Sequence, residues 1–144
     1  MPTRVYRERN QARRICDNGR SEKEVVAMHI AYLVITLILA LMVSYSGIGK
    51  IRRHPLQVKV VHETVGVPLQ YFAWLAACEF AGALGLVLGI WFPPIGIAAA
   101  AGLVLYFVGA IVSHLLIGDA KGSGSAVFML MLAAAALALR VLTR

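Results

Sequence analysis

The chain has 144 residues, of which 60% are hydrophobic and only 15% are charged. Soluble globular domains contain about 45–50% apolar and about 25% charged residues, so both departures indicate a protein whose solvent is lipid. Four membrane spans of about 20 residues each would use most of this length, which excludes a separate folded domain beside a membrane bundle.

Residues 1–24 form a basic arm that holds seven of the 14 Lys and Arg residues. Next to a membrane helix such residues are a common topology signal, and an anionic membrane surface suits them better than nucleic acid. Ser21-Glu22-Lys23-Glu24 has the pattern of a capping box, in which the Ser hydroxyl and the final Glu satisfy free N–H groups. We therefore expect the first membrane helix to begin here.

Four apolar segments follow the arm, and each is long enough to cross the hydrocarbon region as a helix. The predicted spans are residues 25–46, 71–91, 95–117 and 125–142. The Gly-rich segment Ser46–Lys50 is expected to break the first of them.

Residues 51–67 separate the first two spans and are too polar to cross the membrane. Pro55 suits a first helical turn, and Leu56, Val60, Val61 and Val65 can share one helical face. The predicted fold class is therefore all-α: a four-helix transmembrane bundle, residues 25–144, with a short amphipathic helix at the membrane interface between the first two spans.

The distribution of charge predicts the orientation of the bundle. An even number of spans puts both termini on one side, which then holds nine of the 14 Lys and Arg residues against five on the other. This places both termini in the cytoplasm and the protein in the cell (inner) membrane. Arg140, near the end of the last span, is expected to extend its side chain to water.

Small residues predict the helix contacts, because helices in lipid associate through close backbone approach. In the second span they recur every four residues, at Ala77, Ala81, Gly85 and Gly89. Ala98 and Gly102 are the expected counterpart in the third span.

Glu79 is the most informative residue for function, because it lies near the middle of the second span. A carboxylate at mid-bilayer depth costs several kcal/mol, so it should face the bundle interior, be protonated or have a partner. The alternative to a functional role is a protonated Glu that bridges two helices.

Three further residues lie at depths compatible with Glu79: Lys50, Tyr106 and His114. Together they predict a cleft in which Glu79 and His114 are the catalytic candidates, while Lys50 and Tyr106 are ligand-binding candidates. Taken singly, His114 could be an interfacial residue and Lys50 an anchor. No metal site is expected, because Cys16 and Cys78 are far apart and no Cys/His cluster occurs.

Short motifs make the chain resemble the DoxX-like family of small bacterial membrane proteins over residues 31–140. They are Ser46-Gly-Ile-Gly-Lys50, Val65-Gly-Val-Pro68, Glu79-Phe-Ala-Gly82, and Gly109-Ala110 with His114, Gly118 and Asp119. The resemblance implies a four-helix membrane bundle and a link either to quinone-dependent sulfur oxidation or to oxidative-stress complexes, although some members have no assigned role. The basic arm departs from the family pattern, and the lack of a cysteine pair argues against thiol redox chemistry.

Three functions remain open at this point. The first is a membrane subunit that holds a quinone-like or lipid-like molecule near Glu79, with a quinone as the one cofactor suggested. The second is a membrane enzyme in which Glu79 and His114 act as acid and base on a hydrophobic substrate, as in an isomerase or cyclase. The third is a scaffold that recruits a partner protein or a second copy of the chain.

Overall fold

The structure is a computed structural model that describes the backbone of residues 2–143 and the side chains of residues 21–143. Its elements are α1 (Pro2–Ile51), α2 (Pro55–Gln57), the π-helix η1 (Val58–Thr64), the 3-10 helix η2 (Leu69–Tyr71), α3 (Phe72–Leu88), α4 (Pro93–Leu116) and α5 (Gly124–Leu142).

Four helical segments are long and apolar enough to cross a membrane: Ser21–Ile51, Leu69–Leu88, Pro93–Leu116 and Gly124–Leu142. A short helix lies between the first and the second of them. The predicted all-α bundle of four transmembrane helices is therefore confirmed. Arg144, which was counted in the charge balance, lies outside the described residues.

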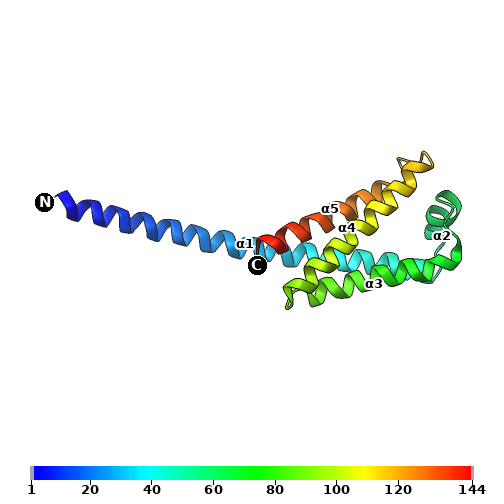
Figure 1. Cartoon of the computed structure of the whole chain (residues 1–144), viewed down its shortest axis with the longest axis horizontal. Coiled ribbons are helices and arrows are strands. Elements are labelled where there is room, and N and C mark those ends of the chain that lie inside the picture. Colours follow the sequence, from blue (N-terminus) through cyan, green and yellow to red (C-terminus); the bar gives the residue numbers. More distant parts are fainter. Residues whose placement is uncertain (1, 144) are drawn as a thin grey trace.

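The first helix begins earlier than the capping box predicted. α1 starts at Pro2, so Ser21 and Glu24 lie within it, and its first part projects away from the bundle as a single rod (Figure 1). The reason is local: the arm has no proline after Pro2 and is rich in Arg and Glu, which favour helix. A capping-box pattern has no effect where the preceding residues are already helical.

The first helix also continues through the predicted break at Ser46–Lys50 and ends at Ile51. Gly47 is buried there because α3 passes close to it; a Cβ on Gly47 would lie 3.2 Å from the Phe80 ring and 3.4 Å from Glu79 Oε2. In a membrane helix a glycine often marks such a close approach and not an end. The continuous helix keeps Ser46 and Lys50 one turn apart on the same face.

The four long helices form a ring in which α1 packs on α3, α3 on α4, α4 on α5 and α5 on α1. Figure 1 shows the end of α5 beside the middle of α1, so the C-terminus emerges on the side from which the arm projects. The interior is apolar, with Leu39, Val43, Leu86, Leu103 and Ala133 almost fully buried. Large apolar side chains remain exposed around the outside, where lipid would contact them: Trp74, Leu84 and Leu116 are examples.

The predicted contact face of small residues on α3 is correct only near the C-terminal end of the helix. Gly85 faces Ala99 and Gly89 faces the backbone of Gly96, whereas Ala77 and Ala81 are exposed. On a helix of 3.6 residues per turn, residues four positions apart are offset by about 40° around the axis. Four small residues at this spacing therefore cannot all lie in one interface. The predicted counterpart was also wrong: Ala98 and Gly102 are exposed, and no atom lies within 4 Å of a Cβ built on Gly102.

Arg140 does not extend to water, contrary to the prediction. It is 5% exposed, its guanidinium donates to the carbonyl oxygens of Gly89 and Ile90, and it lies 4.9 Å from the centre of the Tyr32 ring. The carbonyls that end α3 carry the negative end of its dipole and have no partner within the helix. Arg140 therefore links α5 to the end of α3 and to α1.

Candidate functional site

Glu79 is buried inside the bundle and is only 1% exposed. It lies on the inner face of α3 with Phe72, Ala76, Gly82 and Leu86. Three side chains donate hydrogen bonds to one of its oxygens, Oε1, while the other oxygen, Oε2, has no partner among the described residues. This carboxylate was predicted to face the bundle interior, to be protonated or to have a partner. The structure shows it buried in the interior with a charged partner.

The partner is Lys50 of α1, whose Nζ lies 2.9 Å from Glu79 Oε1. Lys50 is itself 5% exposed. Ser46, one turn earlier, accepts a hydrogen bond from Lys50 Nζ at 2.8 Å and donates one to Glu79 Oε1 at 3.1 Å. The uninterrupted α1 thus supplies both a cation and a hydroxyl, and the pair carries no net charge when both groups are ionised.

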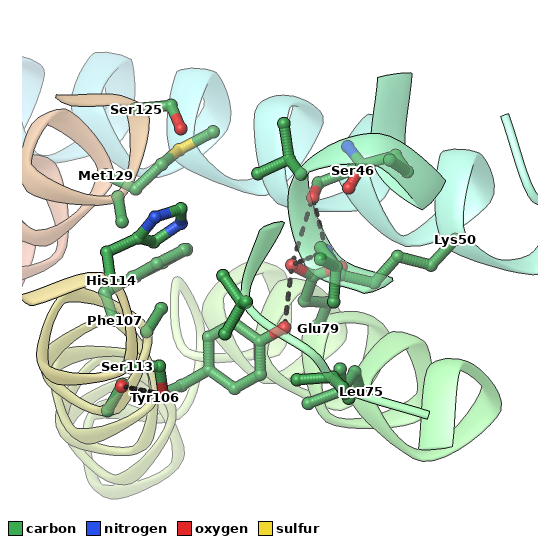
Figure 2. Close-up of a pocket in the computed structure, with 18 of the residues that line it drawn as sticks. Ser46, Lys50, Leu75, Glu79, Tyr106, Phe107, Ser113, His114, Ser125 and Met129 are labelled. Carbon is green, nitrogen blue, oxygen red and sulfur yellow. Dashed lines mark hydrogen bonds and ion pairs between the residues drawn. The ribbon is translucent and has the colours of Figure 1, made fainter. Parts of the chain in front are cut away.

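The third donor is Tyr106 of α4, whose hydroxyl lies 3.1 Å from Glu79 Oε1. Figure 2 shows Ser46 and Lys50 approaching Glu79 from one side and Tyr106 from the other. Three helices therefore meet at one carboxylate oxygen. We call Ser46, Lys50, Glu79 and Tyr106 the polar cluster.

The polar cluster borders a cavity of about 890 Å³. Most of the cavity wall is apolar and comes from α1, α3, α4 and α5, with Leu41, Leu75, Phe107 and Met129 as examples. A volume of this size with a few polar groups on an apolar wall is typical of small-molecule binding sites.

The connection between α1 and α3 supplies another wall of this cavity. The face formed by Leu56, Val60, Val61 and Val65 was correctly predicted, and all four residues line the cavity. The segment is α2 followed by η1, and none of its residues is buried. Its apolar face is therefore turned toward the cavity.

His114 lines the same cavity but bonds to a different acid. It is 6% exposed, and its Nδ1 lies 3.1 Å from Asp119 Oδ2 in the turn between α4 and α5. Asp119 Oδ1 also accepts the Gly122 N–H at 3.0 Å. A Cβ on Gly122 would clash with Asp119 Oδ2, so glycine is needed for this arrangement. Figure 2 shows the His114 ring beside Met129 and Ser125.

The structure thus brings Lys50, Glu79 and Tyr106 into direct contact and places His114 on the same cavity. Ser46 was not predicted as a member, because the expected helix break hid its one-turn spacing from Lys50. Asp119 was given no predicted role, although a carboxylate five residues after His114, across a Gly-containing turn, could have indicated a pair.

The site offers hydrogen-bonding groups to a polar part of a ligand. Glu79 is held by three donors while its other oxygen is buried without a hydrogen-bond partner among the described residues, and the imidazole of His114 can donate or accept a hydrogen bond. Both face a space enclosed mostly by apolar side chains, where hydrogen bonds are stronger than in water.

Comparisons with known proteins agree with this architecture. Residues 34–137 match the DoxX-like family. No curated protein and no solved structure matches the chain. The matched region includes α3, α4, most of α5, the part of α1 from Val34 onward and every residue of the polar cluster. This multi-pass membrane protein belongs to the DoxX-like family.

Proposed function

We propose that the protein binds a quinone-like or lipid-like molecule in the intramembrane cavity beside Glu79. The observation that carries this proposal is the combination of an apolar cavity of about 890 Å³ with a buried, hydrogen-bonded Lys50–Glu79 pair on its wall. A buried ion pair is weak evidence for stability, because apolar residues of similar size are often at least as favourable. A binding role explains why charged groups are kept at this depth.

A quinone head group is compatible with these residues. Its carbonyl oxygens accept hydrogen bonds, and Lys50 Nζ would supply a donor, because Ser46 and Glu79 accept from only two of its three N–H groups. The apolar wall of Leu56, Val60 and Met129 would suit its tail. When bound, a quinone would supply reversible redox chemistry coupled to protons, and Glu79 and His114 are the residues that would hold or release a proton beside it.

A second candidate is a membrane enzyme that uses acid–base chemistry. The observation favouring it is that His114 is paired with Asp119 and lines the same cavity as Glu79. A histidine oriented by a carboxylate is a common general base. The two functions are distinguished by what is recovered from the purified protein: an unchanged ligand supports binding alone, and a converted one supports catalysis.

For localisation, we propose the inner membrane of a bacterial cell with both termini in the cytoplasm, supported by the excess of Lys and Arg on that side. A reporter fused after Arg144 should then behave as cytoplasmic, and one inserted in the loop 118–123 as exported. The reverse pattern would contradict this orientation.

The binding proposal is tested by the hydrophobic molecules that remain with the purified protein. Glu79→Gln keeps the size of the side chain and an oxygen to which Lys50 can donate, but it removes the charge. It should therefore lose some stability, remain folded and lose at least about tenfold of the retained ligand, equivalent to about 1.4 kcal/mol. Tyr106→Phe, which removes one hydroxyl, should give a smaller loss. The quantity to measure is the ligand-to-protein ratio by mass spectrometry after solvent extraction.

Cys78→Ala is the matched control, because Cys78 is the neighbour of Glu79 on α3 but is exposed. It should retain as much ligand as the wild type. Equal retention by wild type, Glu79→Gln and Tyr106→Phe would overturn the binding proposal and leave a scaffold role.

A further inference from the structure

We propose that Asp119 is a positioning residue that holds His114 as a hydrogen-bond acceptor toward the cavity, and that the ligand is therefore a hydrophobic molecule with a hydroxyl group. This inference rests on the proposed binding function and narrows the ligand to quinone-like or lipid-like molecules that carry a hydroxyl, such as the reduced, hydroquinone form of a quinone. It comes from the His114–Asp119–Gly122 arrangement, which is separate from the polar cluster around Glu79.

The orientation of His114 follows from what Asp119 can accept. An ionised carboxylate only accepts hydrogen bonds, so the 3.1 Å contact between Asp119 Oδ2 and His114 Nδ1 requires a proton on Nδ1. In a neutral imidazole the other nitrogen, Nε2, is then an acceptor. Within the described residues no hydrogen bond is made by Nε2, and the ring lines the cavity.

The turn holds Asp119 in this position. Its second oxygen, Oδ1, accepts the Gly122 N–H at 3.0 Å, which fixes the rotation of the carboxylate. His114 is 6% exposed and therefore cannot turn freely to water. An acceptor fixed on an apolar wall discriminates between ligands: a hydroxyl can donate to Nε2, whereas an ether or carbonyl oxygen facing it would leave two acceptors opposed.

Asp119→Asn should exchange the hydrogen-bond acceptor that faces the cavity for a donor, with little change in the shape of the side chain at position 119. The Asn Oδ1 can still accept from Gly122, which directs the amide NH2 toward His114 Nδ1. The ring proton should then move to Nε2, and the cavity should present a donor in place of an acceptor. The opposite amide orientation would place an NH2 against the Gly122 N–H, so it is disfavoured.

The experiment uses the full-length protein at pH 8 and two probes with the same apolar body, 4-nonylphenol and 4-nonylanisole. The wild type should bind the phenol more tightly than the methyl ether, and Asp119→Asn should reduce that ratio by about two- to tenfold, as expected for one hydrogen bond. The two probes differ in how strongly water solvates them, but this difference is the same for both proteins. It therefore cancels when the ratio of the two affinities is compared between wild type and Asp119→Asn. His114→Gln should also lose the wild-type preference.

Nitrogen-15 NMR of the histidine rings tests the orientation without any ligand. The His114 signals should show a proton on Nδ1 in the wild type and on Nε2 in Asp119→Asn, a change that a merely structural role would not produce. A wild-type proton on Nε2, or an unchanged probe ratio in Asp119→Asn, would overturn this inference. Failure of both probes to bind the wild type, with the proton on Nδ1, would instead overturn the proposed function and the ligand class with it.

Discussion

Lys50→Met should destabilise the folded bundle by about 3–5 kcal/mol, because it leaves Glu79 as a buried carboxylate without its cation. Lys50 is 5% exposed and Glu79 1% exposed, so water cannot replace the lost partner. Ser46 and Tyr106 would still donate to Glu79, but neither supplies a positive charge. The measurement is the free energy of unfolding in a mild detergent with increasing denaturant.

The double variant Lys50→Met/Glu79→Leu separates stability from function. Replacing a buried ion pair by apolar residues of similar volume is often neutral or stabilising, so the double variant should recover most of the lost stability. It should nevertheless lose the retained ligand, because both the donor and the carboxylate are absent. A Lys50→Met protein as stable as the wild type would contradict the geometry of the pair.

Gly85→Leu should also destabilise the bundle, by about 1–3 kcal/mol, through overpacking between α3 and α4. A Cβ on Gly85 would lie 2.7 Å from the Cβ of Ala99, closer than two carbon atoms can approach without a shift. A leucine there must push α4 away from α3, and with it Tyr106. The measurement is the midpoint of thermal unfolding in detergent.

Gly102→Leu is the matched control, because Gly102 lies on α4 with no atom within 4 Å of a built Cβ. Both changes add the same side chain and gain the same helix propensity, about 0.8 kcal/mol, so their difference isolates the clash. Gly102→Leu should unfold at or slightly above the wild-type midpoint. Equal midpoints for the two variants would show that the Gly85 face meets lipid.

Features that depend on composition and depth could be predicted from the sequence. The four helices follow from uninterrupted apolar length, and the burial of Glu79 follows from the cost of a carboxylate at mid-membrane depth. Lys50 and Tyr106 were placed near Glu79 by their depth along their helices. The hydrogen bonds between them confirm that contact, while their proposed roles stay predictions.

Features that depend on neighbouring helices could not be predicted in this way. Whether Gly47 ends a helix or admits a neighbour depends on where Phe80 lies, and local sequence does not contain that information. Arg140 looked like a residue near water because its partners, the carbonyls of Gly89 and Ile90, lie about 50 residues away in the sequence. Asp119 gained a role only when the α4–α5 turn brought it back to His114.

The most direct test for a ligand site in this cavity is to map where a hydrophobic molecule contacts the protein. A photoactivatable nonylphenol derivative, added to the wild-type protein in lipid nanodiscs, should label Leu56, Val60, Val61 and Met129, which line the cavity. Labelling should saturate, be displaced by unmodified 4-nonylphenol and fall in Glu79→Gln. Non-saturating labelling confined to exposed positions away from the cavity, such as Leu84 and Leu116, and unchanged in Glu79→Gln, would contradict a ligand site in this cavity.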